Sequence, residues 1–275
     1  MPGSSPKMLG KAAALSADEI VIDLEDAVAL DAKSDARGAT LAALDGWAGP
    51  TAAVRVNAPR TPWCHEDVVA MAGAARLVSI VVPKVESAGD VAFVERLLDG
   101  AEAAAGRERP LRVQALIETA EGLLRLDEIA SASSRLTSLI LGYADLAASL
   151  GGDRRPADWL PAQHALVVAA RANGLQAIDG PYLGTAPDEG FLEAARHAVR
   201  LGFDGKWAIH PSQLAALDDA FSPTDEEVAH ARAVVDALAR AEAEGHGAVA
   251  LDGQMLDEAL RAAALRTLAR AGATA

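Results

Sequence analysis

The sequence predicts an α/β protein folded as a (β/α)₈ barrel, the TIM-barrel architecture, and three observations point to this fold class. Short runs rich in Val, Ile and Leu alternate with segments of helical spacing over most of the chain. The alternation repeats about every 25 to 40 residues, which is the spacing of strand–helix units in a barrel. A polar residue ends each apolar run, and barrel enzymes place their chemistry at the C-terminal ends of the strands. We therefore expect a parallel barrel with an active site at that end.

Seven strands can be counted in the sequence, one fewer than a closed barrel requires. We expect them at residues 19–23, 51–57, 76–84, 113–118, 136–145, 175–179 and 205–210. Residues 1–15 have the character of the loop and helix of a first unit whose own strand is missing. The sequence predicts either a truncated or misplaced start or a barrel whose first position is filled in another way.

Segments with helical periodicity separate the strands. Ser87 is a candidate N-cap, and Gly174 closes another helix. The helices are expected near residues 7–17, 33–44, 65–75, 88–105, 120–131, 164–174 and 188–201, with a loop at 151–161 and a short helix after Pro211.

From Pro223 onward the chain changes character. A long helix at 224–244, a glycine-rich turn, a short VALDG segment and a last helix at 255–271 are expected there. We therefore predict a TIM-barrel catalytic domain at 1–222 and a C-terminal helical extension or lid at 223–275.

Composition excludes several classes of protein. Against 39 acidic residues the chain has 25 Lys and Arg, a formal charge of −14, which argues against broad surfaces for nucleic acid or anionic membranes. Cys64 is the only cysteine, so neither an intrachain disulfide nor a thiolate metal cluster is possible. No apolar run is long enough to span a membrane, and the N-terminus lacks a signal-peptide core. We expect a soluble, cytoplasmic enzyme or binding protein.

Two carboxylates mark the centre of the predicted site. Glu118 and Asp145 follow neighbouring strands, joined by a helical segment at 120–131. Mg²⁺ is often bound by one or two carboxylates, with substrate completing its shell. The competing interpretation is that both are ordinary strand-end carboxylates or helix caps, which are common at helix starts.

Arg55 ends another strand, and its planar guanidinium suits bidentate recognition of a carboxylate. A structural salt bridge to the acidic cluster formed by Asp23, Glu25 and Asp26 is the alternative, and the two roles can coexist. His210 has the chemistry of a general acid or base, but a structural turn at His-Pro is favoured. Lys84 could form a Schiff base, an option that ranks below metal catalysis beside a carboxylate pair.

Ten short segments occur in an order shared with one known family, and together they cover almost the whole chain. They are PGSSPKM, IVIDLEDAV, VRVN, VVPKVES, LIETAEGL, LGYADLAASLGG, AIDGPY, GFDGKWAIHPSQL, FSPTDEEV and GQMLD. On these segments the sequence resembles the citrate lyase β-subunit-like family of the HpcH/HpaI aldolase superfamily, which includes malyl-CoA and citramalyl-CoA lyases.

The resemblance implies a Mg²⁺-dependent barrel that makes or breaks a carbon–carbon bond beside a thioester. By position, Glu118 and Asp145 look like the metal ligands, and Arg55 like the arginine that binds the keto-acid. Asp257, in GQMLD, matches an acid/base that reaches a neighbouring subunit's site in a trimer, although periodicity alone makes it a helix cap. Lys7 lies where family members contact CoA. One departure is Gln163, which stands where the family usually has arginine and puts acyl-group or carrier specificity in doubt.

The function expected from these residues is Mg²⁺-dependent cleavage of a β-hydroxyacyl-CoA, such as citryl-, malyl-, citramalyl- or 3-hydroxy-3-methylglutaryl-CoA. The products are acetyl-CoA (or a homologue) and a keto-acid, and the reverse reaction is a Claisen-type condensation. An acyl-carrier thioester could replace CoA. One alternative is a CoA-independent, metal-dependent pyruvate or oxaloacetate aldolase. The other is a non-catalytic subunit or binding protein with a degenerate barrel.

Overall fold

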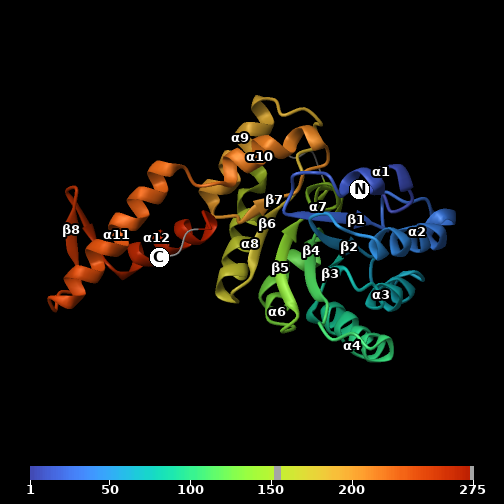
Figure 1. The fold of residues 1–275 in the computed structure, drawn as a ribbon. Coiled ribbons are helices and arrows are strands. Elements are labelled where there is room, and N and C mark those ends of the chain that lie inside the picture. The colour runs from blue at the N-terminus through green and yellow to red at the C-terminus, as the bar shows by residue number, and fades with distance from the viewer. Residues whose placement is uncertain (152–155, 273–275) are drawn as a thin grey trace. The chain divides into compact units, whose positions relative to one another are not determined.

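The computed structural model describes residues 1–151 and 156–272, and it divides into two compact units, Met1–Leu217 and Asp218–Ala275 (Figure 1). Part of the loop predicted at 151–161 lies outside the described residues. No helix in the described ranges combines the length and apolar character needed to cross a bilayer.

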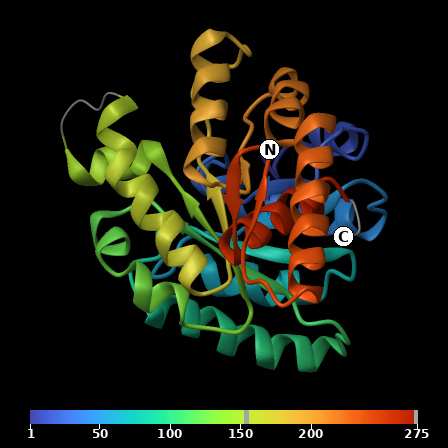
Figure 2. The ribbon, with the colours of Figure 1, turned by 90° about the vertical axis from the view of Figure 1, so that its left-hand side faces the viewer.

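The first unit is built on one parallel sheet whose strands follow one another in chain order, β1 to β7 (Figure 2). The strands are β1 (Glu19–Asp23), β2 (Thr51–Arg55), β3 (Leu77–Val82), β4 (Arg112–Ile117), β5 (Leu136–Leu141), β6 (Gln176–Asp179) and β7 (Gly205–Lys206). This sheet curls into a half-barrel. The seven strands counted from the sequence are confirmed, and the expected α/β class with them.

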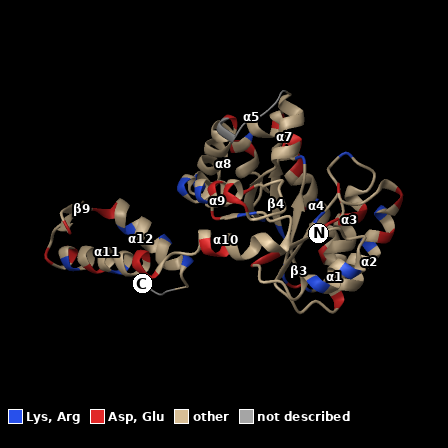
Figure 3. Cartoon of the chain, turned by 90° about the horizontal axis from the view of Figure 1, so that it is seen from above, with Lys and Arg blue, Asp and Glu red and all other residues tan. Residues whose placement is uncertain are grey.

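Helices connect the strands and follow the last of them, with acidic and basic residues interspersed along them (Figure 3). They are α1 (Pro6–Ala12), α2 (Lys33–Asp45), α3 (Cys64–Ala72), α4 (Ala88–Ala105), α5 (Ala120–Leu124), α6 (Leu126–Ala130), α7 (Tyr143–Leu150), α8 (Leu160–Ala172), α9 (Glu189–Leu201) and α10 (Leu214–Phe221), with 3₁₀ turns at Leu30–Ala32, Pro156–Trp159 and Pro211–Gln213. Ser87 caps α4 through a capping box with Asp90, as predicted.

The inner face of the sheet is layered. A fully apolar layer takes one side chain from each of four neighbouring strands, namely Ala53, Val81, Leu116 and Ile140. Nearer the strand starts, Gln114 Nε2 donates to Ser79 Oγ at 2.8 Å and to Glu19 Oε1 at 2.8 Å. Burial raises the pKa of Glu19 despite these hydrogen bonds. Gln114, Ser79 and Glu19 therefore supply one another's hydrogen-bond partners at this end of the sheet, which indicates a structural role.

The first residues of the chain extend the sheet beyond β1. Pro2 forms a parallel bridge with Asp23, and the Met1 ammonium donates to Val21 O at 2.8 Å. Asp23 N in turn donates to Met1 O at 2.7 Å. The sequence predicted that a strand before β1 is missing, and the described residues have a single bridge at that place.

The seventh strand is shorter than predicted, and placing His210 at its end is wrong. β7 stops at Lys206, and the side chain of Gln213 accepts hydrogen bonds from Ile209 N and His210 N. His210 caps the 3₁₀ turn that begins at Pro211. Hydrogen bonds from the backbone to the Gln213 side chain replace the strand pairing here. They favour the structural turn at His210-Pro211, which the sequence also suggested.

The second unit contains α11 (Asp225–Ala243), the hairpin of β8 (Val249–Leu251) and β9 (Gln254–Leu256), and α12 (Glu258–Arg270). Predicting helix from Met255 is wrong, because Asp252 and Gly253 have positive φ angles of 50° and 82° and close a hairpin. The Asp-Gly pair is a recognised hairpin signal. The core of this unit packs α11 against α12 and β9, with Val234, Leu238, Leu256 and Leu268 buried in it.

Candidate active site

Glu118 and Asp145 lie at the carboxyl end of the sheet, on adjacent connections. Glu118 directly follows β4 and is 2% exposed, whereas Asp145 occupies the first turn of α7, with its side chain 37% exposed. Gly142, the residue before α7, packs onto Glu118: a Cβ at position 142 would lie 2.5 Å from Glu118 Oε2. A glycine is needed here because any side chain would displace the carboxylate.

Glu118 is surrounded by negative charge. Burial raises its pKa to about 8, and the charges of Glu25 and Asp145 add to the shift more than Lys84 and Arg55 offset it. Its Oε1 accepts a 3.0 Å hydrogen bond from Lys84 N. A buried carboxylate beside two like charges is in an unfavourable position that a divalent cation would relieve.

The donor set fits a hard cation such as Mg²⁺, which prefers carboxylate and water oxygens. The described residues contain no group of three or more His, Cys, Asp or Glu side chains arranged to hold a metal by themselves. A cation at Glu118 and Asp145 would therefore take its remaining oxygens from substrate and water, as Mg²⁺ commonly does.

Lys84 links the two carboxylates to the acidic cluster at the end of β1. Its Nζ lies 2.5 Å from Glu25 Oε1, 3.5 Å from Asp26 Oδ2 and 3.6 Å from Asp145 Oδ1. Burial lowers its pKa, but the bonds and charges of Glu25, Glu118 and Asp145 outweigh burial and raise it. A lysine held protonated is a poor Schiff-base nucleophile, which favours charge balance over covalent catalysis.

Arg55, at the end of β2, donates a bidentate pair of hydrogen bonds to Asp23. Nε donates to Oδ1 at 2.8 Å and Nη2 to Oδ2 at 2.6 Å. Nη1 lies 3.0 Å from Glu25 Oε2 without the geometry of a hydrogen bond. These bonds use two of the five N–H donors, so the guanidinium retains donors for a second carboxylate. The structural salt bridge considered from the sequence is present, and it leaves some N–H donors of Arg55 unused.

Two networks that sequence reasoning missed support this edge of the sheet. In the first, Lys33 Nζ donates to Leu24 O at 2.9 Å and to Glu25 O at 2.7 Å, fixing the loop after β1. A second, here called the Asp179 network, joins Asp179, Lys206, Tyr143 and Gln163. Lysine at a strand end is too common for sequence alone to single out Lys206, and the sequence marked Lys33 only as part of the family resemblance.

The Asp179 network is largely buried, and it continues through Gln163 Oε1 to His197 Nε2 at 3.3 Å. Lys206 Nζ donates to Asp179 Oδ2 at 2.6 Å and to Gly180 O at 2.5 Å, and its side chain is 2% exposed. Tyr143 OH donates to the other oxygen of Asp179 and accepts from Gln163 Nε2 at 2.7 Å. Gln163, the position where the chain departs from the resemblance, therefore faces a tyrosine hydroxyl inside the protein.

The remaining predicted site residues lie elsewhere. Lys7 is exposed in the first turn of α1, and no contact found in the described ranges joins it to the carboxylates. Asp257 belongs to the second unit, where its Oδ1 accepts from Ala259 N at 3.0 Å and Leu260 N at 3.3 Å as the N-cap of α12. The helix-cap role that periodicity indicated for Asp257 is present.

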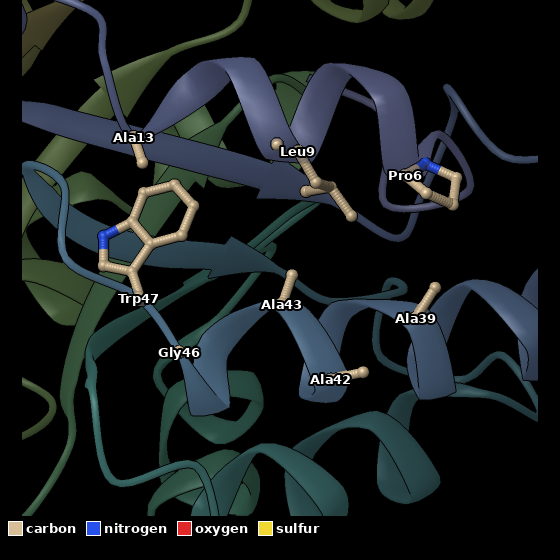
Figure 4. Close-up of a pocket in the computed structure, with 9 residues that line it drawn as sticks. Pro6, Leu9, Ala13, Ala39, Ala42, Ala43, Gly46 and Trp47 are labelled. Atoms are coloured by element: carbon tan, nitrogen blue, oxygen red, sulfur yellow. The ribbon is translucent and has the colours of Figure 1, made fainter.

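A pocket of about 490 Å³ lies between α1 and α2, away from this chemistry (Figure 4). Leu9, Ala13, Ala43 and Trp47 point into it. Of the described residues that line it, none has a titratable side chain, so it offers no catalytic group.

Comparisons with known proteins identify the family of the chain. The sequence profile of the HpcH/HpaI aldolase/citrate lyase family matches residues 1–211. An L-malyl-CoA/β-methylmalyl-CoA lyase of Cereibacter sphaeroides is 40% identical, over 93% of this chain and 88% of the relative. A (3S)-malyl-CoA thioesterase of the same species is 39% identical, over 100% of this chain and 94% of the relative.

Among solved structures, CitE from Mycobacterium tuberculosis in complex with magnesium, acetoacetate and coenzyme A is similar. It is 35% identical, covers 99% of this chain and 96% of its own, and superposes with a TM-score of 0.78. The family match spans most of the chain, and both curated relatives exceed 30% identity over nearly all of it. The chain therefore belongs to the HpcH/HpaI aldolase/citrate lyase family.

Proposed function

We propose that this protein is a Mg²⁺-dependent lyase that cleaves a β-hydroxyacyl-CoA into an acyl-CoA and a short keto-acid, with malyl-CoA or β-methylmalyl-CoA as the first substrates to test. The observation that carries the proposal is the buried Glu118 carboxylate, destabilised by Glu25 and Asp145 and facing the strand ends. The lyase relative and the magnesium- and CoA-bound structure support the same chemistry.

In this reaction the chain's own residues have separate tasks. Glu118 and Asp145 would hold the cation, which when bound supplies positive charge to stabilise developing oxyanion charge. The free N–H groups of Arg55 would orient the keto-acid carboxylate, while Asp23 keeps the guanidinium in place. Lys84 balances the negative charge of Glu25 and Asp145.

We further propose that the seven strands are seven of the eight positions of a (β/α)₈ barrel, with Met1 and Pro2 beside β1 at the remaining position. The Pro2–Asp23 bridge supports this arrangement. Asp257 would act as the acid/base in the site of a neighbouring copy, in a homo-oligomer that the family resemblance suggests is a trimer. Lys7 would contact the CoA portion of the substrate.

A lyase assay with Mg²⁺ tests the proposal on malyl-, β-methylmalyl-, citramalyl-, citryl- and 3-hydroxy-3-methylglutaryl-CoA. Wild type and Glu118→Gln are compared, and we expect the variant to lose at least about a hundredfold in rate, as for loss of one electrostatic stabiliser. Full turnover by wild type after chelation, or by Glu118→Gln with Mg²⁺, would contradict the proposal.

Thioester hydrolysis is the second candidate, because the (3S)-malyl-CoA thioesterase aligns with the whole chain. The two reactions differ in products: a lyase releases glyoxylate and acetyl-CoA from malyl-CoA, whereas a thioesterase releases malate and free CoA. Quantifying free thiol and keto-acid in the same reaction decides between them.

A further inference from the structure

The Asp179 network lies next to the backbone that carries Asp145. Tyr143 is the first residue of α7, and Asp145 is two positions further along the same turn. The N-cap of α7 is Gly142, which has no side chain to bond the free amides of the first turn. The tyrosine hydroxyl is therefore a polar anchor of this turn to the neighbouring strands, beside the apolar contact of the fully buried Leu146.

The anchor is held on every side. Tyr143 OH bridges Asp179 and Gln163, and Lys206 Nζ lies 5.8 Å from the centre of its ring. Trp159 packs against the ring at 5.1 Å with an interplanar angle of 60°. A Cβ at Gly180 would lie 2.8 Å from Tyr143 Cδ2 and 2.1 Å from Leu141 O, so the loop after β6 presses directly on the turn.

Among the described residues, few contacts fix the side chain of Asp145. Its carboxylate is 37% exposed, and the contact found for it is the 3.6 Å approach of Lys84 Nζ. Its position depends on the backbone of α7 more than on bonds to its own oxygens. Positioning groups around a metal ligand commonly decide metal affinity.

We propose that Tyr143, held by the Lys206–Asp179 pair, is a positioning residue that sets the Asp145 carboxylate for Mg²⁺ binding. This inference rests on the proposed function, since it takes Glu118 and Asp145 as the magnesium ligands. The path of influence runs from the end of β7 through β6 to the first turn of α7. The Tyr143 contacts affect the affinity for Mg²⁺, whereas Arg55 recognises the carboxylate of the substrate.

Isothermal titration of Mg²⁺ into the full-length protein, together with the melting temperature measured without Mg²⁺, tests this inference. Tyr143→Phe removes only the hydroxyl, and Tyr182→Phe, the other tyrosine in the chain, is the matched control. We expect Tyr143→Phe to weaken Mg²⁺ binding about tenfold to a hundredfold. Its melting temperature should fall by about a few degrees relative to Tyr182→Phe, because the buried Asp179 carboxylate loses a donor, and both variants should stay folded at the temperature of the titration. Tyr182→Phe should bind Mg²⁺ like wild type.

Lys206→Met tests the same relay from its far end. If it lowers the melting temperature sharply by leaving Asp179 charged and buried, Lys206→Met/Asp179→Asn takes its place. Combined with Tyr143→Phe, either variant should weaken Mg²⁺ binding no further than one change alone, because all act through one anchor.

Three outcomes separate the possible failures. Wild-type affinity in Tyr143→Phe, or equal losses in both tyrosine variants, would overturn the positioning role while leaving the metal site intact. The proposed function and this inference would both be overturned if the wild-type protein bound no Mg²⁺. The same would follow if wild type and Glu118→Gln bound Mg²⁺ with equal affinity. Additive losses in the combined variants would overturn the relay.

Discussion

The backbone amide of Lys84 donates a 3.0 Å hydrogen bond to Oε1 of Glu118, and Lys84 adopts a left-handed conformation with φ of 51°. Non-glycine residues rarely adopt this conformation, and they concentrate at functional sites. The strained backbone after β3 points its amide at the carboxylate, while the side chain reaches Glu25 and Asp145. One residue therefore contributes both a neutral and a charged contact to the candidate magnesium site.

The raised pKa of Glu118 predicts that Mg²⁺ binding releases a proton. With a pKa of about 8, Glu118 is largely protonated at pH 7 in the metal-free protein, so Mg²⁺ competes with a proton. Affinity should rise about tenfold per pH unit below pH 8 and level off above it. Titration calorimetry in two buffers of different ionisation enthalpy measures the proton count, and a value near zero at pH 7 would contradict the shift.

The same shift predicts a pH dependence of stability without metal. A carboxyl group whose pKa is raised on folding stabilises the protein below its unfolded pKa, and this contribution is lost as pH rises through the folded value of about 8. Metal-free wild type should therefore lose stability between pH 5 and about 8 more steeply than Glu118→Gln, which cannot ionise at this position. Parallel melting-temperature profiles for the two proteins would rule this out.

Arg55 should be needed for folding as well as for substrate binding. Arg55→Met leaves Asp23 buried, 6% exposed, without its forked partner, and breaking such a pair costs about 3–5 kcal/mol. Arg55→Lys keeps the charge but cannot reproduce the planar fork, so its loss should be smaller. Urea unfolding gives both values, and Arg55→Met within 1 kcal/mol of wild type would show that the pair contributes little.

The capping and catalytic roles of Asp257 can be separated by two substitutions. Asn is as good an N-cap as Asp, so Asp257→Asn should keep the stability of α12 and lose turnover, whereas Asp257→Ala should also cost about 1 kcal/mol. Unfolding free energies and lyase rates are compared for both. An Asp257→Asn protein with wild-type rate would remove this residue from the proposed mechanism.

A shared site predicts complementation between inactive variants. When Glu118→Gln and Asp257→Asn chains are mixed and assembled together, some sites combine an intact Glu118 with an intact Asp257 from another copy. Random assembly of equal amounts should restore about one quarter of the wild-type rate. Mixtures no more active than the separate variants would place both residues in one chain's site.

Close packing at Gly142 predicts a large effect from one methyl group. Gly142→Ala would place Cβ 2.5 Å from Glu118 Oε2, so it should abolish Mg²⁺ binding and destabilise the fold by about 1–3 kcal/mol. Gly100→Ala, in α4 with open space around it, should instead stabilise by up to about 1 kcal/mol. Measuring Mg²⁺ binding and urea unfolding on both variants separates crowding at the site from a general effect of replacing glycine.

Much of the sheet could be predicted from sequence because its strands are buried on both faces and appear as continuous apolar runs. Glu118 and Arg55 could be placed at one edge for the same reason, since parallel strands end together. The Asp179–Lys206–Tyr143 contacts could not be predicted, because they depend on how β6, β7 and the start of α7 pack together, which no local sequence pattern encodes. The sequence predicts a longer β7 than the structure has. The side chain of Gln213 accepts the backbone hydrogen bonds of Ile209 and His210 there, and an apolar run of residues cannot reveal such a contact. The β8–β9 hairpin did have a local signal in Asp252-Gly253.

The strictly sequential order of β1 to β7 also shapes how the protein forms. Neighbouring strands join residues between 23 positions apart (Val113 with Leu136) and 38 positions apart (Ser138 with Gln176), so pairing never waits for a distant segment. Each new strand–helix segment can dock onto the sheet edge left by the preceding one during synthesis. Glu118 and Asp145 are both present once α7 has emerged from the ribosome, and the Asp179 network that holds Tyr143 is complete once β7 has followed, still before the second unit has been made. The carboxylate pair can thus be assembled, and stabilised by Mg²⁺, while translation is still under way.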